Sequence, residues 1–102
     1  MIAEISVVPV TSGESLSKYV ARAIKVIEES GKRYELSSMG TAVEVDDYTE
    51  LGALLEKIND ALISMGVKRV YMVVKIDFRV RGGSIEQKKT SVMEKLEKFG
   101  IS

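Results

Sequence analysis

Residues 69–81 alternate regularly between apolar and polar positions. Even-numbered positions carry apolar side chains, and odd-numbered positions carry mostly charged or aromatic ones. A period of two over this length predicts a β-strand with one apolar face. On its other face, Lys75, Asp77 and Arg79 fall in one row, about 7 Å apart. This row is either an ordinary solvated sheet face, which is the simpler interpretation, or part of a polar binding floor.

The start of the chain predicts a strand followed by a helix. Ile2–Val10 alternates like a strand, and its proline lies near the end, where the missing N–H does least harm. Apolar residues at helical spacing follow and predict a helix that ends near Gly31. Thr11 with Glu14, or Ser12 alone, is a candidate cap for the start of this helix.

A hairpin comes next. Residues 33–38 and residues 41–46 predict two short strands, and Met39-Gly40 between them suits a tight turn with the glycine at positive φ. Polar groups are concentrated here in Tyr34, Ser38, Thr41 and Glu44.

Two more helices have clear start signals. Asp47 with Glu50 forms a capping box for a helix that ends at Gly66, and Ser84 with Gln87 forms one for a last helix. The apolar stripe of that last helix is Ile85, Val92, Leu96 and Phe99.

The predicted order is β-α-β-β-α-β plus a terminal helix, within one domain that spans residues 1–102. Right-handed crossovers then give an α+β, ferredoxin-like fold: a four-stranded antiparallel sheet with the first two helices on one face. The other face receives apolar side chains such as Val8, Tyr71 and Val73 beside charged ones. The last helix or a second subunit could cover it, and the last strand is an edge that invites pairing. We therefore predict a homodimer or homotetramer built through sheet edge, sheet face or both.

Composition restricts the chemistry. The chain has no cysteine and no histidine, which excludes disulfides, thiolate nucleophiles, imidazole metal ligands and a Ser-His-Asp triad. Fifteen basic residues balance fifteen acidic ones and tryptophan is absent, so no nucleic-acid partner is expected. Without a membrane-spanning run or an N-terminal signal pattern, the expected location is the cytoplasm, with no membrane partner. We expect a binding or assembly module rather than an enzyme.

The hairpin is the first candidate site. A carboxylate beside hydroxyl groups can hold a nitrogen heterocycle, with Glu44 pairing to ring N–H groups and Ser38 or Thr41 to other polar atoms. The alternative is a polar turn with one solvent-facing glutamate. On a regular strand Thr41 and Glu44 would point to opposite faces, because they are three residues apart, unless a bulge or the turn brings them together.

Two other candidate sites lie on the long strand and in the loop that follows it. Residues 79–84 hold two arginines and two glycines before a helix, which suits a phosphate or sulfate site or a plain loop. The ending Gly-Lys-Ser/Thr of a P-loop is missing. The row of Lys75, Asp77 and Arg79 would have to pair well or bind a ligand if a subunit covered it, since unpaired buried charge is costly.

These residues resemble a known family. The specific pieces are Ser30-Gly31, Tyr34, Met39-Gly40-Thr41, Glu44 and the run Lys-Ile-Asp-Phe-Arg at 75–79. Together with the proline near the end of the first strand, they are similar to the YkoF-like, thiamine-binding family of small ferredoxin-like proteins. The chain departs from the family pattern at Ser38 and Val45, where the family usually has proline and glycine.

The resemblance implies sheet-paired dimers and tetramers that bind thiamine or its hydroxymethylpyrimidine part, with no known reaction and no other cofactor. It implies Glu44 as the partner of the aminopyrimidine, Ser38 and Thr41 as hydroxyl contacts, and Tyr34 or Tyr71 against the thiazolium cation. A regulatory or structural oligomer that binds an anion or a protein through residues 79–84 is the alternative. An acylphosphatase-like enzyme is disfavoured, because residues 10–13 lack the arginine that it would need.

Overall fold

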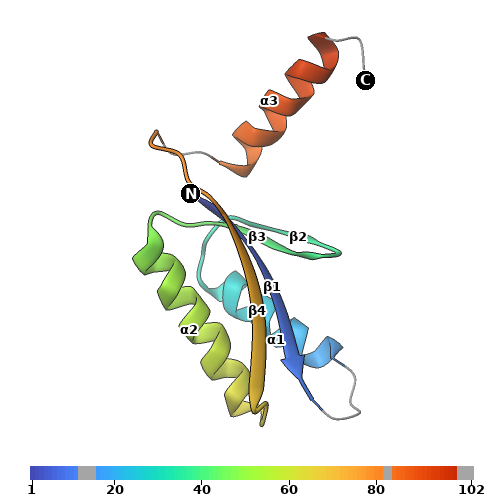
Figure 1. Cartoon of the computed structure of the whole chain (residues 1–102), viewed down its shortest axis with the longest axis vertical. Helices are drawn as coiled ribbons and strands as arrows, with labels where there is room; N and C mark the ends of the chain where they lie inside the picture. Colours follow the sequence, from blue (N-terminus) through green and yellow to red (C-terminus); the bar gives the residue numbers. More distant parts are fainter. Residues whose placement is uncertain (12–15, 82–83, 99–102) are drawn as a thin grey trace.

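The computed structural model describes residues 1–11, 16–81 and 84–98. The elements are β1 (Ile2–Val10), α1 (Ser17–Glu29), β2 (Tyr34–Ser37), β3 (Gly40–Glu44), α2 (Tyr48–Ser64), β4 (Arg69–Asp77) and α3 (Ile85–Lys98). The strands form one antiparallel sheet in the order β2-β3-β1-β4 (Figure 1). This confirms the predicted ferredoxin-like α+β fold with an additional C-terminal helix.

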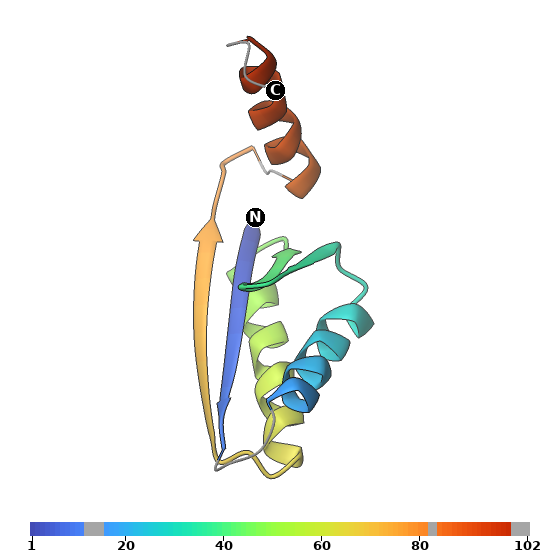
Figure 2. The ribbon, with the colours of Figure 1, turned by 90° about the vertical axis from the view of Figure 1, so that its right-hand side faces the viewer.

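One face of the sheet packs against α1 and α2 (Figure 2). The core between these layers is fully apolar at its centre, because every second strand residue meets the inward faces of the two helices. Its most buried members include Ala3, Ile5, Val43, Ile27, Ile58 and Leu62. The opposite side, here called the open face, has no helix layer over most of its length. The predicted assignment of strand faces is therefore confirmed for the covered side.

Both predicted caps of the later helices form, as a full capping box at α3 and, at α2, with the return bond on Asp46, the residue before the N-cap. The Asp47 side chain accepts the Glu50 N–H at 2.8 Å, while the Glu50 carboxylate accepts the Asp46 N–H at 3.0 Å. Ser84 and Gln87 exchange both bonds of a capping box, at 3.0 and 3.2 Å. These bonds satisfy backbone N–H groups at and just before the starts of the two helices.

The predicted cap of α1 is wrong for Thr11. The N-cap of α1 is Leu16, with no side-chain cap bond, and Thr11 immediately follows β1, several residues too early to reach the helix. Ser12 and Glu14 lie outside the described residues.

The hairpin turn sits one residue earlier than expected. Ser37 pairs with Gly40, so Ser38 and Met39 form the turn, and both strands are shorter than predicted. Among the described glycines, positive φ occurs at Gly31 and Gly66 and not at Gly40. Gly40 is required for a different reason: a Cβ there would lie 3.1 Å from the Ile5 carbonyl oxygen, so a side chain would push β3 away from β1.

The long strand is also shorter than its alternation suggests. β4 ends at Asp77, which pairs with Ile2, the first residue of β1, so later residues have no strand to pair with. Phe78 instead stacks on Tyr48 with ring centroids 6.3 Å apart, and Val80 is 94% exposed. The prediction of a strand through residue 81 is therefore wrong, because alternation marks amphipathic character and not a bonding partner.

α3 extends away from the end of the sheet, beyond the start of β1 (Figure 1). The molecule measures 50 × 29 × 19 Å with a radius of gyration of 15.7 Å, larger than the roughly 13 Å typical of a compact domain of this length. Val92 and Met93 of this helix are more than half exposed, and Phe99 lies outside the described residues. α3 thus leaves the apolar part of the open face uncovered. Among the described residues, no helix is long and apolar enough to cross a membrane.

Candidate functional site

The open face has two ends of different character. Its apolar end carries Val8, Val10, Tyr71 and Val73, all between 40% and 56% exposed. The pairing of β1 with β4 brings these side chains into one patch, since Val8 is opposite Tyr71 and Val10 lies one row further along the same strand. A continuous patch of this kind on a sheet is typical of a surface that another molecule covers.

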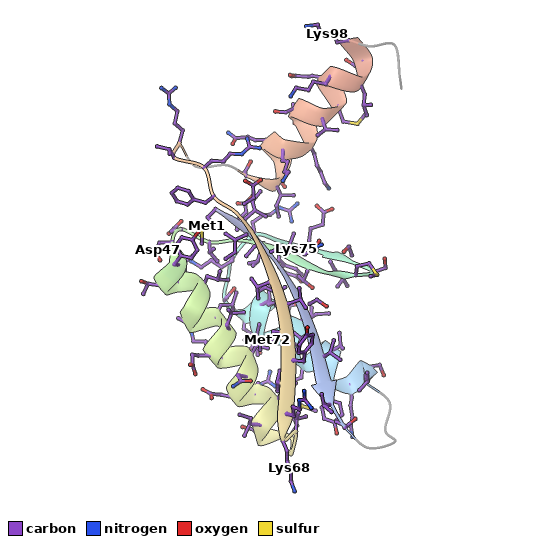
Figure 3. All side chains as sticks on the ribbon, viewed as in Figure 1. Met1, Asp47, Lys68, Met72, Lys75 and Lys98 are labelled. Carbon is purple, nitrogen blue, oxygen red and sulfur yellow. The ribbon has the colours of Figure 1, made fainter. Side chains whose placement is uncertain are left out.

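The other end of the open face is charged. Glu44, Ile2 and Asp77 form one row across three strands, and the next row on that face runs Glu35, Ala42, Glu4 and Lys75. Neighbouring strands lie about 4.8 Å apart, so charges in a row are within reach of one small molecule. Lys75, labelled in Figure 3, lies on the part of β4 nearest α3.

The first turn of α3 lies against this charged end and binds three of its carboxylates. Glu44 accepts the Ile85 N–H at 2.7 Å, Asp77 pairs with Lys88 Nζ at 2.7 Å, and Glu35 pairs with Lys89 Nζ at 2.6 Å. A fourth ion pair joins Arg33, just before β2, to Glu86 at 2.6 Å. Negative charge is favoured at the start of a helix by the free N–H groups there, so the sheet contributes part of the helix cap.

A hollow of about 570 Å³ lies between the sheet and this helix turn, and we call it the charged hollow. Ile2 and Ala42 form an apolar floor, and α3 forms the roof through Ile85, Lys88 and Lys89. The polar side chains around it are Glu4, Glu35, Ser37, Lys75 and Asp77. This volume, with an apolar floor and a few convergent polar groups, is typical of a small-molecule site.

Two carboxyl groups at the attachment of the helix, Asp77 and Glu86, have lowered pKa values. The hydrogen bond from Lys88 lowers the pKa of Asp77, and the positive charges of Lys88 and Arg79 add to the effect. The pKa of Glu86 is lowered by its own backbone N–H and then by the hydrogen bond from Arg33. Both shifts come from groups that bind the charged carboxylate.

The structure does not bring Glu44 together with the other predicted hairpin residues. Thr41 is buried on the helix-covered face, while Glu44 lies on the open face, as their spacing requires. Ser38 is in the turn and borders a separate hollow of about 180 Å³ on the helix side, together with Thr41. Tyr34 packs against the core, and its hydroxyl donates to Glu28 at 3.4 Å. A role of these residues in ligand contact stays a prediction.

The predicted row of charges on the long strand, Lys75, Asp77 and Arg79, is partly assembled. Lys75 and Asp77 border the charged hollow, whereas Arg79 follows the end of β4 and lies 3.9 Å from the Asp77 carboxylate. Glu4 and Glu35 were missed. Their strand parity places each on the open face, but only the register between strands shows that they meet Lys75. Of the predicted anion loop, residues 82–83 lie outside the described residues.

Carboxylates, one hydroxyl and lysines can bind a cation, an amine or a heterocycle edge by hydrogen bonds. Within residues 1–11, 16–81 and 84–98, no group of three or more acidic side chains is arranged to hold a metal ion.

Comparison with known proteins gives matches over nearly the whole chain. A family model described as thiamine-binding protein matches residues 3–93. A UPF0045 protein of Methanothermobacter thermautotrophicus is 38% identical over 96 residues, covering 92% of this chain and 97% of that protein. A UPF0045 protein of Methanocaldococcus jannaschii is 32% identical over 102 residues, with 98% and 92% covered.

Solved structures share the fold. A crystal structure of the M. jannaschii protein matches with a TM-score of 0.79 and 33% identity, over 91% of this chain and 95% of that one. A Thermotoga maritima protein, described as one proposed to act in thiamine biosynthesis or salvage, matches with a TM-score of 0.77 and 26% identity. That match covers 89% of this chain and 96% of the other.

Proposed function

The chain belongs to the thiamine-binding protein family, and we propose that it binds thiamine or its hydroxymethylpyrimidine part in the charged hollow, without catalysis. The observation that carries this proposal is the hollow of about 570 Å³ whose carboxylates surround an apolar floor. The absence of cysteine and histidine also favours binding over acid–base or nucleophilic chemistry.

The chemistry of thiamine is complementary to these groups. Its flat pyrimidine ring can rest on Ile2 and Ala42, while the exocyclic amine donates to a carboxylate such as Glu35 or Glu4. Lys75 offers a donor for a ring nitrogen. The thiazolium cation gains from the acidic surroundings, because opposite charges attract strongly where water is partly excluded.

Of the hairpin residues predicted to contact the ligand, this proposal keeps only Glu44 near it. Glu44 is at the rim of the hollow through its bond to Ile85, which forms part of the roof. Ser38, Thr41 and Tyr34 lie elsewhere in the subunit, so their contribution as ligand contacts would have to come from another arrangement of the hairpin.

We also propose that two or more copies of the chain associate through the apolar end of the open face and the free edge of β4. Val8, Tyr71 and Val73 expose apolar surface that a second copy would bury. β4 is nine residues long and, among the described strands, pairs with β1 alone, which leaves a row of backbone groups able to pair with another strand. Sedimentation velocity at micromolar concentration tests this proposal, and a mass of one subunit would contradict it.

Isothermal titration with thiamine and with hydroxymethylpyrimidine tests the ligand. We expect heat of binding that Glu35→Gln and Asp77→Asn each weaken by roughly 10- to 100-fold, the range for a lost charge-assisted hydrogen bond. Glu56→Gln, an exposed carboxylate on α2, is the matched control and should leave the affinity unchanged. Absence of both heat and thermal shift at millimolar ligand would remove the proposal.

A further inference from the structure

α3 is attached to the rest of the subunit by few groups, and nearly all are charged. Ile85 is its one buried residue within the described part of the helix. Among the described residues, the other attachments are the bonds of Ile85, Glu86, Lys88 and Lys89 given above. Further along, Val92 and Met93 are more than half exposed. The first turn therefore decides whether the helix stays docked.

Three of these attachments use carboxylates at the charged end of the open face. Lys88 neutralises Asp77, Lys89 neutralises Glu35, and the Ile85 N–H occupies Glu44. Glu35 and Asp77 are also the acceptors that a bound cation would need. Both lysine side chains are more than half exposed, and exposed ion pairs of this kind are individually weak.

We propose that the first turn of α3 is a built-in competitor for the charged hollow, which a cationic ligand displaces. This inference rests on the proposed function and adds its regulation: the ligand takes over Glu35 and Asp77, Lys88 and Lys89 leave, and α3 detaches from the sheet. When the two lysines are gone, Lys75 is the one basic group left on the hollow's described lining, against Glu4, Glu35 and Asp77. The vacated hollow therefore attracts a cation more strongly than the covered one.

The coupling works in both directions. If ligand binding loosens α3, then loosening α3 must raise the affinity for the ligand by the same factor. The released helix exposes Ile85 in addition to the apolar side chains it already presents. Occupancy of the site is thereby converted into a change in the accessible surface of the subunit.

The first test compares two double variants by titration with thiamine. Lys88→Gln/Lys89→Gln should bind thiamine roughly three- to tenfold more tightly than the wild type, because the competitor is weakened while the Ser84 and Gln87 cap of the helix is intact. Lys95→Gln/Lys98→Gln removes the same charge from the last turn of the same helix, about 10 Å further away, and should leave the affinity unchanged.

The second test follows the helix itself. The chain has no cysteine, so Met93→Cys gives a single site for a spin label on the exposed part of α3. We expect the label to become more mobile when thiamine is added. In the Lys88→Gln/Lys89→Gln background it should be mobile before any ligand is added.

The outcomes separate the two proposals. If the wild type binds thiamine but the lysine variant binds equally or less tightly and the label does not respond, competition by α3 is overturned while the ligand assignment stands. If neither protein binds thiamine, the proposed function fails and the competition fails with it. Binding that only the Lys88→Gln/Lys89→Gln protein shows would support both.

Discussion

The two faces of the sheet come from alternate residues of the same strands, yet they differ in almost every property. Ala3, Ile5 and Val43 on the covered face are at most 2% exposed, because α1 and α2 pack directly on them. Val8 and Val73 on the open face are about 40% exposed. The composition of each face is partly apolar, so hydrophobicity alone does not distinguish them. The faces differ in whether helices of the same subunit pack on them.

This difference assigns separate tasks to the two faces. The covered face accounts for most of the buried apolar surface, and therefore for stability. The open face has one apolar end, which we propose for assembly, and one charged end, which we propose for a ligand. Variants that affect folding should thus map to one side of the sheet, and variants that affect binding to the other.

The largest difference in stability should be between two variants of β1, one on each face of the sheet. Ile5→Ala removes a fully buried side chain, and we expect it to lower the free energy of unfolding by about 2–5 kcal/mol. Val8→Ala, three residues later on the open face, should change it by less than about 0.5 kcal/mol at subunit concentrations too low for association. Urea unfolding followed by circular dichroism measures both. Equal losses would abolish the contrast between the faces.

A second contrast uses two glycines. Gly40→Ala places a Cβ 3.1 Å from the Ile5 carbonyl oxygen and 3.3 Å from Glu4 Cγ, so β3 must move away from β1. We expect a loss of about 1–3 kcal/mol, the usual cost of overpacking.

Gly52→Ala is the control for this change, since nothing lies within 4 Å of its added Cβ and the residue is in α2. It should stabilise the protein by roughly 0.5–1 kcal/mol. Thermal unfolding of both variants is the measurement. A Gly40→Ala protein as stable as the wild type would show that the hairpin adapts without loss.

The open face can be tested without disturbing the fold. Val73→Asp puts a charge in the middle of the apolar end, and we expect it to weaken subunit association at least tenfold, which is about 1.4 kcal/mol. Its unfolding as a separate subunit should change little, because the side chain is already 41% exposed. Sedimentation equilibrium over a dilution series measures the association constant. Lys57→Asp, on the exposed side of α2, is the matched control.

The smallest effect is the response of α3 to acid. The pKa values of Asp77 and Glu86 are lowered in the docked state, so docking is favoured above their ordinary values, about pH 4. The contribution is lost as the pH falls through the lowered values, since the protonated carboxyls no longer hold Lys88 and Arg33. A spin label on α3 should therefore become mobile below about pH 4.

In Asp77→Asn the label should be more mobile already at pH 7, with a weaker response to acid. Circular dichroism in the same range controls for loss of the sheet. A label that stays immobile to pH 3 would show that the ion pairs of Asp77 and Glu86 are not needed to hold the helix.

Much of the fold follows from local patterns in the sequence. Alternation located β1 and most of β4, and the reciprocal caps located the starts of α2 and α3, because each signal lies within a few residues of its effect. The end of β4 could not be found in this way. It depends on where β1 begins, which is a property of a partner far away in the sequence.

The candidate site was harder to predict from the sequence, because it too depends on residues that are distant along the chain. Lys75 and Asp77 could be placed by their own strand, whereas Glu4 and Glu35 join them only through the register of three strands. The approach of Lys88 and Lys89 depends on how the connection after β4 turns. The hairpin residues do not form one cluster within the subunit, because the period of two places Thr41 and Glu44 on opposite faces of the sheet.

The ladder between the first and the last strand has a consequence for how the chain reaches this shape. Ile2 pairs with Asp77, so one edge of β1 stays without a partner strand until β4 has been synthesised. At typical rates of synthesis, 5–20 residues per second, roughly 70 residues take on the order of 3 to 15 seconds. Closing such a distant pair is slow compared with forming a hairpin. The newborn chain is therefore most open to capture by chaperones during this interval, and a ribosome stall before residue 69 would leave its sheet unfinished.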